Sequence, residues 1–421
     1  MSSAHLTFDT TGSKIASRVK GMRASAVRNL FAAATSEDII SLSGGMPDVS
    51  LLPSESIAKA VASTFAADQA VAMQYGGTDG RVETREVVCE LARDLGIRCK
   101  PDDVMLTSGA QQALDLIAKT FIDPGDIILT EGPTYLGALQ AFSAYEPDIR
   151  CIPFDDDGMR MDLLEEELQR IGKNNPKLKY LYTIPNFQNP GGVTMTPERR
   201  RRLIELSHEY NFYVIEDDPY GRLRYEGGHM IPLKVLDPDV IYLGTISKIF
   251  APGLRIGWII APRTVLARIN LVKQGADLCG SSFDQVVVER YFRDCPWEST
   301  LQDFINTYGV RRNAMLEALD KYFPAEASWT RPEGGFFIWV TLPGYVDTDS
   351  MLSEALKAGV TYVPGSGCFP DGKRGKNCMR IAFCFEDPDK LDEAIKRLAG
   401  VINDRLELYR AFIEAGAIKE D

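Results

Sequence analysis

The chain of 421 residues is long enough to bury a large hydrophobic core, and its length favours two or three domains. Hydrophobic residues make up 45% and charged residues 25%, as in an ordinary soluble globular protein. The net charge of −12 disfavours a nucleic-acid-binding surface, which would need a basic stripe.

The cysteines and the N-terminal sequence indicate the compartment. The eight cysteines are scattered, with no Cys-x-x-Cys pair and none clustered with a histidine, so we expect no metal site. Residues 1–20 lack the apolar core of a secretory leader, and no apolar run reaches the roughly 18 residues of a membrane span. We therefore expect a cytoplasmic protein that binds neither a membrane nor nucleic acid.

Histidine chemistry is poorly supported. The three histidines, His5, His208 and His229, lie apart from any serine or cysteine motif. A nicotinamide dehydrogenase is also disfavoured, because no strand is followed by Gly-x-Gly-x-x-Gly. Catalysis must then depend on lysine, tyrosine, carboxylates or a cofactor.

Residues 100–265 alternate short apolar runs with amphipathic helical stretches. Helices are predicted over 110–121 and 198–210. Strands are predicted over 104–107, 127–130, 180–184, 212–215, 240–243 and 257–261. This alternation predicts an α/β domain with a mainly parallel, buried sheet, whose ligands bind at the carboxyl ends of the strands.

A second pattern begins near residue 300 and predicts a smaller α+β domain. Its expected helices cover 301–322, 350–358 and 387–414, and its strands lie within 334–342, 360–363 and 379–385. The segment before residue 55 is too short to fold alone, so we expect it to pack on this domain. The predicted organisation is a large domain over 55–300 and a small domain made of 1–54 with 301–421.

Two predicted turns can bind an anion or aim an amide. Residues 106–116 pass from a strand through small residues into a helix, whose start favours an anion. An ordinary helix cap by Ser108 explains the same residues. Asn189 precedes Pro190, Gly191 and Gly192, which fix a loop that can aim its amide at a ligand or serve only as a turn.

Two further strand ends carry charge. Asp217 ends a buried strand, where an unpaired carboxylate would be costly, so either a cationic ligand or helix capping ahead of Pro219 is expected. Lys248 follows the strand at 240–243 and precedes Arg255, whose guanidinium suits a phosphate. An amine held out of water loses its proton more easily, and the free amine attacks carbonyls.

Together these four turns describe a site for a phosphorylated aromatic aldehyde. They supply an anion cradle, a carboxylate for a pyridinium, a hydroxyl from Tyr220 and an amide from Asn189 for a phenolate, and a lysine for an imine. The intervals between them match βαβ crossovers, so they can converge on one crevice. These are the protein groups expected for pyridoxal phosphate.

The chain resembles class I and II aminotransferases of fold type I over essentially its whole length, and is most similar to the 2-aminoadipate/kynurenine aminotransferase branch. The resemblance implies a mainly parallel seven-stranded sheet between helices, plus a smaller α+β domain. The motifs that carry it are Ser43-Gly-Gly-Met-Pro-Asp48, Gln74-Tyr75, Thr107-Ser-Gly-Ala-Gln-Gln112, Asn189-Pro-Gly-Gly192, Glu216-Asp-Asp-Pro-Tyr220, Ser247-Lys248 and Leu254-Arg255.

The resemblance implies a role for each matching residue. Lys248 corresponds to the Schiff-base lysine, and Asp217 to the partner of the pyridine nitrogen, which we expect to be ionised at neutral pH. Tyr220 and Asn189 correspond to the ligands of the phenolate oxygen, and Tyr135 to the residue stacked on the ring. The residues that correspond to the phosphate site are Ser108, Gly109, Ala110, Gln111, Thr245, Ser247 and Arg255.

The remaining implied roles concern the substrate and a second subunit. Arg380 corresponds to the clamp of the substrate α-carboxylate, and the backbone of Gly45 lies close to the substrate. Tyr75 corresponds to a tyrosine that reaches the phosphate of a partner subunit, which implies a homodimer. Arg28 matches an arginine that pairs a distal substrate carboxylate, although a solvated helix arginine explains it equally well.

The sequence departs from the family pattern at two positions. Ala110 stands where many relatives carry a serine, so backbone N–H groups must replace one side-chain contact to the phosphate. Asn189-Pro-Gly-Gly replaces the commoner Asn-Pro-Thr-Gly, which leaves the role of Asn189 in place.

The implied function is transfer of an amino group from an L-amino acid to a 2-oxo acid such as 2-oxoglutarate. A 2-aminoadipate-like or glutamate-like donor is expected first, and aromatic amino acids second. A pyridoxal-phosphate lyase or decarboxylase on the same fold would keep almost every residue above. A transcription regulator of aminotransferase type would need a DNA-binding domain before the fold, and about fifty residues precede it here.

Overall fold

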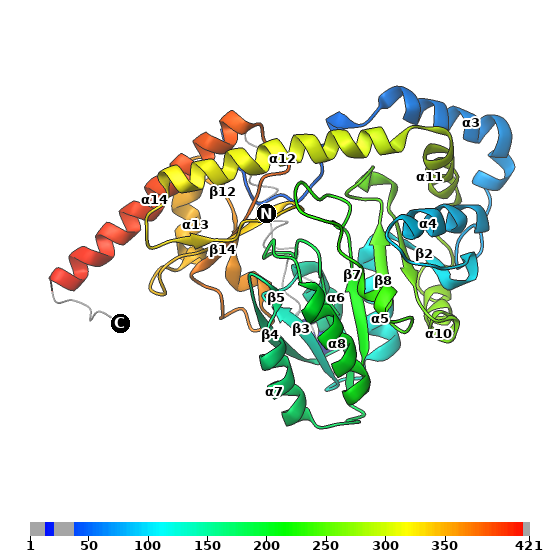
Figure 1. Cartoon of the computed structure of the whole chain (residues 1–421), viewed down its shortest axis with the longest axis horizontal. Coiled ribbons are helices and arrows are strands. Elements are labelled where there is room, and N and C mark those ends of the chain that lie inside the picture. The colour runs from blue at the N-terminus through cyan, green and yellow to red at the C-terminus, as the bar shows by residue number, and fades with distance from the viewer. Residues whose placement is uncertain (1–12, 21–37, 416–421) are drawn as a thin grey trace.

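The computed structural model describes residues 13–20 and 38–415 (Figure 1). Its main element is a largely parallel sheet, in which β9 runs antiparallel to both neighbours and β8, β7, β6, β3 and β4 are mutually parallel. The two-residue β5 adds an antiparallel edge to the seven expected strands. In spatial order the strands are β2 (Val104–Ser108), β9 (Ile256–Ile260), β8 (Ile241–Thr245), β7 (Tyr213–Asp217), β6 (Leu178–Thr183), β3 (Ile127–Gly132), β4 (Asp148–Asp155) and β5 (Gly158–Met159).

Helices cover both faces of this sheet. Successive strand residues point to opposite faces, so Tyr180 and Tyr182 join the core beneath α5 and α6, whereas Leu181 joins the core beneath α7 and α8. The helices of this part are α3 (Ser54–Ala72), α4 (Val82–Asp94), α5 (Gly109–Phe121), α6 (Leu136–Ser143), α7 (Met161–Ile171), α8 (Pro197–Tyr210), α9 (Leu233–Leu236), α10 (Arg263–Gln274) and α11 (Ser282–Asp294). Two 3-10 turns, η2 (Pro101–Asp103) and η3 (Pro252–Leu254), precede β2 and β9.

A second, smaller unit surrounds an antiparallel sheet with its own hydrophobic core. This sheet has the order β10 (Ser328–Trp329), β11 (Phe337–Thr341), β14 (Cys378–Ala382) and β13 (Val363–Pro364). The N-terminal β1 (Ile40–Ser41) pairs with β12 (Val360–Thr361), so the chain from residue 40 packs on this unit. The remaining described elements of the whole chain are α1 (Ser17–Lys20), η1 (Val49–Leu51), α12 (Trp297–Tyr322), α13 (Thr348–Lys357), η4 (Gly365–Cys368) and α14 (Pro388–Glu414).

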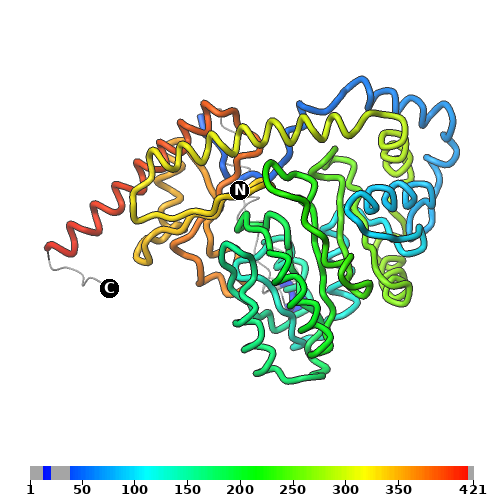
Figure 2. Tube along the Cα trace, viewed as in Figure 1, coloured from blue at the N-terminus to red at the C-terminus, as the bar shows by residue number. Residues whose placement is uncertain are grey.

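The long helix α12 runs along both units (Figures 1 and 2). Phe304 and Tyr308 in its first half belong to the core of the large sheet, and Met315 and Leu319 in its second half belong to the core of the small unit. The expected boundary at residue 300 falls near the start of this helix, and the division into two domains remains our proposal.

The topology brings several strand ends to one edge. Because β9 is antiparallel to both β2 and β8, the carboxyl ends of β2 and β8 lie on the same side as those of β7, β6 and β3. Ser108, Asp217 and Thr245 each end one of these strands. Within the described ranges, no helix is both long and apolar enough to cross a membrane.

Candidate active site

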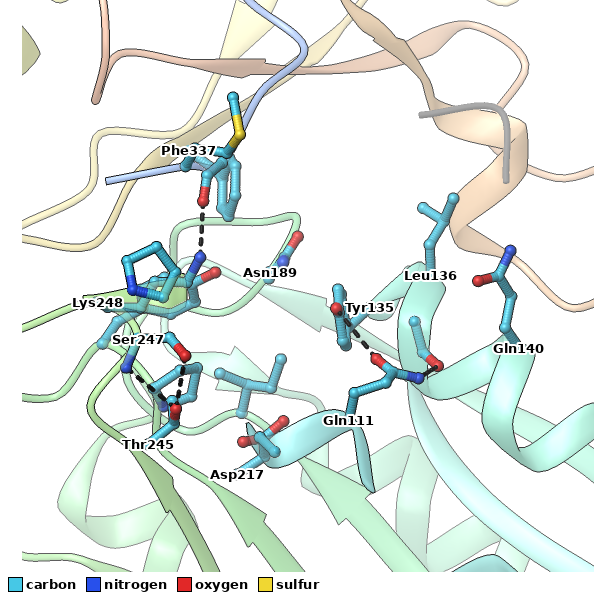
Figure 3. A pocket seen from close by; sticks show the side chains of 18 of the residues that line it. Gln111, Tyr135, Leu136, Gln140, Asn189, Asp217, Thr245, Ser247, Lys248 and Phe337 are labelled. Carbon is cyan, nitrogen blue, oxygen red and sulfur yellow. Dashed lines mark hydrogen bonds between the residues drawn. The ribbon is translucent and has the colours of Figure 1, made fainter. Parts of the chain in front are cut away.

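A cavity of about 490 Å³ lies between this sheet edge and the small unit (Figure 3). The large sheet contributes its strand ends, and the small unit contributes Gly45, Phe337 and Arg380. Most residues expected from the sequence line the cavity together. They are Gly45, Ala110, Gln111, Tyr135, Asn189, Asp217, Tyr220, Thr245, Ser247, Lys248, Arg255 and Arg380.

The amine of Lys248 is buried at the floor of the cavity. Its Nζ donates a hydrogen bond to the carbonyl oxygen of Gly45 at 2.7 Å, so the amine points toward the small unit. The pKa of Lys248 is lowered to about 8, mainly because the amine is buried, and the guanidinium groups of Arg380 and Arg255 contribute to this lowering. A neutral amine is therefore accessible near physiological pH, as a nucleophile requires.

Asp217 presents a carboxylate with one free oxygen. Its Oδ2 accepts a hydrogen bond from the hydroxyl of Tyr182 at 2.8 Å, whereas its buried Oδ1 has no partner among the described residues. Burial raises the pKa of Asp217 to about 7, partly offset by the Tyr182 hydrogen bond. The expectation of full ionisation at neutral pH is thus wrong for the chain alone, because it used the value of an exposed carboxyl. A cationic group against Oδ1 would restore ionisation.

The start of α5 and the loop before β9 form an anion cradle. Gly109 has φ of +74°, and a Cβ there would lie 2.9 Å from Cζ of Arg255, so only glycine lets the two approach. The first N–H groups of a helix lack intrahelical partners, and those of Gly109, Ala110 and Gln111 open this cradle. Ser108 forms no side-chain cap, so the alternative of an ordinary N-cap is wrong.

Hydroxyl groups complete the opposite wall of the cradle. Thr245 Oγ1 donates to Ile256 O at 3.0 Å and accepts from the backbone N–H of Ser247 at 3.1 Å. Its oxygen also lies 2.9 Å from Ser247 Oγ. These bonds fix both hydroxyls on the surface of the cavity that Lys248 and Arg255 also line.

Arg380 and Asn189 form a buried pair at the boundary between the two units. Arg380 Nη1 donates to Asn189 Oδ1 at 3.1 Å, and Nη2 donates to the carbonyl oxygen of Ser43 at 2.8 Å. The buried Nε of Arg380 has no partner in the described part of the chain. The guanidinium also lies 4.1 Å from the ring centroid of Phe337. Arg380 therefore retains donor capacity for an anionic ligand.

Tyr135 and Tyr220 supply the aromatic walls. Tyr135 is the residue before α6, and its hydroxyl lies 3.4 Å from Gln111 Oε1. Tyr220 packs edge-to-face on Phe336 and Phe337 and is almost fully buried. Burial raises the pKa of both phenols, so each keeps its proton at neutral pH.

Among the described residues, three that were expected at the site, Tyr75, Ser108 and Gly109, do not line this cavity. Tyr75 is 79% exposed and does not line the cavity of its own chain. Arg28 lies outside the described residues, so its role stays a prediction.

Several residues of the site were not predictable from the sequence motifs. Tyr182 belongs to a predicted strand, and its contact with Asp217 depends on the alignment of β6 with β7. Gln188 donates to Glu131 at 3.1 Å and accepts from the backbone of Gly191, which holds the loop of Asn189. The missed wall residues are Met46, Leu136, Gly137, Gln140, Ile184, Pro219, Pro252 and Phe337. The Gly334-Gly-Phe-Phe337 run was a usable signal for the last of these.

These residues fit pyridoxal phosphate on structural grounds. A protonated ring nitrogen would satisfy the unpaired Oδ1 of Asp217, and the cradle at Gly109 would accept a phosphate. Lys248 supplies an amine for the aldehyde, and Arg380 supplies a cation for the carboxylate of an amino acid.

Comparison with known proteins agrees with this fit. Residues 37–398 match the family model of class I and II aminotransferases. Aromatic-amino-acid aminotransferase 1 of Thermococcus litoralis is 46% identical over 390 residues, covering 92% of this chain and 93% of that protein. Two similar solved structures also cover nearly the whole chain.

The first is kynurenine aminotransferase of Pyrococcus horikoshii in complex with PMP, which is 46% identical with a TM-score of 0.89 and covers 93% of this chain and 97% of its own. The second is α-aminoadipate aminotransferase of Thermus thermophilus, complexed with N-(5'-phosphopyridoxyl)-L-leucine. It is 34% identical with a TM-score of 0.86 and covers 94% of this chain and 98% of its own.

Proposed function

We propose a specific role for each residue of the site. The premise is that the chain belongs to the class I and II aminotransferases and is a transaminase that uses pyridoxal phosphate on a type I fold. The observation that carries the proposal is the convergence of Lys248, Asp217 and Arg380 on one cavity beside a phosphate cradle. Asp217 binds the ring nitrogen, and the cradle at Gly109 and Arg255 binds the phosphate. Asn189 and Tyr220 bind the phenolate oxygen, and Tyr135 covers the ring.

Bound pyridoxal phosphate supplies an aldehyde and an electron-withdrawing ring that stabilises negative charge at the substrate α-carbon. Arg380 binds the α-carboxylate of the incoming amino acid and so orients its α-carbon toward Lys248. The neutral Lys248 amine would serve as the general base and acid that holds and moves the proton of that α-carbon. Its lowered pKa keeps part of the lysine neutral and able to accept the proton.

We propose amino donors with apolar or aromatic side chains. Among the described residues, the cations of the cavity are Lys248, Arg255 and Arg380, and each already has a role. The remaining wall contains Met46 and Leu136, with the amide of Gln140 as a polar group. A donor with a distal carboxylate therefore needs a cation from outside the described residues, such as Arg28. The names of the relatives, aromatic-amino-acid, kynurenine and aminoadipate aminotransferases, support both substrate classes.

We further propose a cytoplasmic homodimer with 2-oxoglutarate as an acceptor. Tyr75 supports the dimer, because a tyrosine that is 79% exposed in one chain is available to a second copy. In the dimer its hydroxyl would reach the phosphate bound by the partner subunit, which places each site at the interface.

The decisive experiment compares Lys248→Ala with wild type in amino-group transfer from phenylalanine, kynurenine and 2-aminoadipate to 2-oxoglutarate. Lys396→Ala, on the exposed side of α14, is the matched control. We expect K248A to abolish formation of glutamate from every donor while K396A retains it. Full transfer by K248A, or release of carbon dioxide without transfer by the wild type, would contradict the proposal.

A further inference from the structure

The start of α5 is held from behind by a row of side chains that do not line the cavity. Gln112 Oε1 accepts a hydrogen bond from the backbone N–H of Ser108 at 2.7 Å. The Nε2 of the same amide donates to Asp277 Oδ2 at 2.6 Å. Asp277 in turn accepts two hydrogen bonds from Lys273 Nζ, at 2.7 and 2.9 Å. The row therefore runs from α10 to the turn that opens the anion cradle.

Lys273 is the unusual member of this row. Its side chain is completely buried, although burying an ammonium is costly without a partner. In the described part of the structure, Asp277 is the partner of its ammonium, and the proposed chemistry at Lys248 does not use it. A neutral, apolar residue would fill the same place at lower desolvation cost, so the charge calls for a further explanation.

The row fixes one specific backbone group. With the N–H of Ser108 taken by Gln112, the next three N–H groups, of Gly109, Ala110 and Gln111, lie at the free start of α5. Their direction depends on the peptide planes that lead into α5, and the bond from Ser108 holds the first of these, the plane between Thr107 and Ser108. The positive charge of Lys273 also holds the Asp277 carboxylate against Gln112. Without that charge the carboxylate would be free to turn toward solvent, since a quarter of the Asp277 side chain is exposed.

We propose that Lys273, Asp277 and Gln112 are positioning residues for the phosphate cradle, and that they set how strongly the chain prefers a phosphorylated over an unphosphorylated aldehyde. The inference rests on the proposed placement of the cofactor phosphate at Gly109. None of the three residues touches the cofactor; they act through the backbone of Ser108. Their loss therefore weakens phosphate binding and leaves the contacts to the aldehyde and the ring in place.

The test is a comparison of two ligands with the full-length, cofactor-free protein. Dissociation constants for pyridoxal phosphate and for pyridoxal, which lacks the phosphate, are measured by absorbance titration. Lys273→Met removes the charge at similar volume, and Gln112→Met removes the acceptor of the Ser108 N–H. Each variant should lower the preference, which is the dissociation constant of pyridoxal divided by that of pyridoxal phosphate, about tenfold, since the hydrogen bond that holds the Ser108 backbone is lost or weakened.

Lys234→Met is the matched control. Lys234 is partly buried and donates to Pro238 O and Val240 O just before β8, at the edge of the sheet opposite to the cavity. Its variant should keep the wild-type ratio. A general loss of structure in K273M would weaken the binding of both ligands equally and leave the ratio of their dissociation constants unchanged. A Lys273→Arg variant, which keeps the charge, should keep the wild-type ratio.

The outcomes separate this inference from the proposed function. If the wild type does not prefer pyridoxal phosphate over pyridoxal, the phosphate placement itself is wrong. If the wild type prefers it and both K273M and Q112M keep the full ratio, the positioning role is wrong and the site stands. If K273M does not fold, Q112M alone decides, because Gln112 lies at the partly exposed start of α5 and its change buries no charge.

Discussion

The hydroxyl of Tyr182 offers a sensitive test of the role of Asp217. Tyr182→Phe removes one oxygen atom and with it the hydrogen bond to Asp217 Oδ2. The carboxylate would then have neither oxygen bonded by the described residues, because Oδ1 already lacks a partner. The charged form of Asp217 loses its stabilising donor, while the packing around the ring changes little.

The size of the effect follows from the geometry. A hydrogen bond to a charged acceptor stabilises it by about 1.5–3 kcal/mol, and this one is 2.8 Å long and fully buried. At about 1.4 kcal/mol per unit, the pKa of Asp217 should rise by about one to two units above its value of about 7 in wild type. A protonated carboxyl cannot neutralise a pyridinium, and at pH 7 this rise lowers the ionised fraction of Asp217 about 5- to 50-fold, so the affinity for pyridoxal phosphate should fall by about the same factor.

The assay is a titration of the cofactor-free protein with pyridoxal phosphate at pH 7, followed by visible absorbance. Tyr180→Phe is a closely matched control, because Tyr180 lies two residues earlier on β6, is also fully buried, and has a hydroxyl that finds no hydrogen-bond partner within residues 13–20 and 38–415. Tyr180→Phe should bind the cofactor like wild type. Equal affinities of the two variants, or wild-type binding by Y182F, would refute the role given to this carboxylate.

Three further predictions concern the other parts of the site. The rate of cofactor uptake should rise about tenfold per pH unit below pH 8 and level off above it, because the pKa of Lys248 is lowered to about 8 and only the neutral amine attacks. A stopped-flow pH series with a midpoint near 10.5 would contradict this prediction. Gly109→Ala should weaken binding of the cofactor phosphate more than tenfold, because the added Cβ meets Arg255. Gly125→Ala, also at positive φ but with open surroundings, should leave phosphate binding unchanged. Competition by inorganic phosphate measures the phosphate affinity of both variants. Gln140→Glu should lower kcat/KM for 2-aminoadipate about tenfold relative to phenylalanine, because it adds a negative charge to the cavity wall. An equal change for both donors would show that Gln140 does not face the side chain of the substrate.

Most of the central sheet was predictable from hydrophobic pattern. The six predicted strands correspond to β2, β3, β6, β7, β8 and β9, because strands buried on both faces appear as continuous apolar runs. The strand β4 was missed, since polar residues such as Asp148, Arg150 and Asp155 interrupt its pattern and Pro153 is atypical of a strand. It lies next to the edge of the sheet, where such residues remain exposed.

The cavity residues were predictable where they follow strands, because parallel strands deliver their ends to one edge. Asp217, Thr245 and Lys248 are examples. The contacts between them were not predictable in the same way. The bond from Tyr182 to Asp217 depends on the register of β6 against β7, and the bond from Gln112 to Asp277 joins parts of the chain 165 residues apart. The pKa of Asp217 also depends on burial, which reference values for exposed groups do not contain.

The helix α12 has a thermodynamic consequence for the whole molecule. Its first half completes one core with Phe304 and Tyr308, and its second half completes the other with Met315 and Leu319. Unfolding of either core exposes apolar side chains of α12, and the same helix is packed into the other core, so the two units share one cooperative unfolding transition. A calorimetric trace should accordingly show one peak, and a fragment severed at residue 300 should not persist as a folded half.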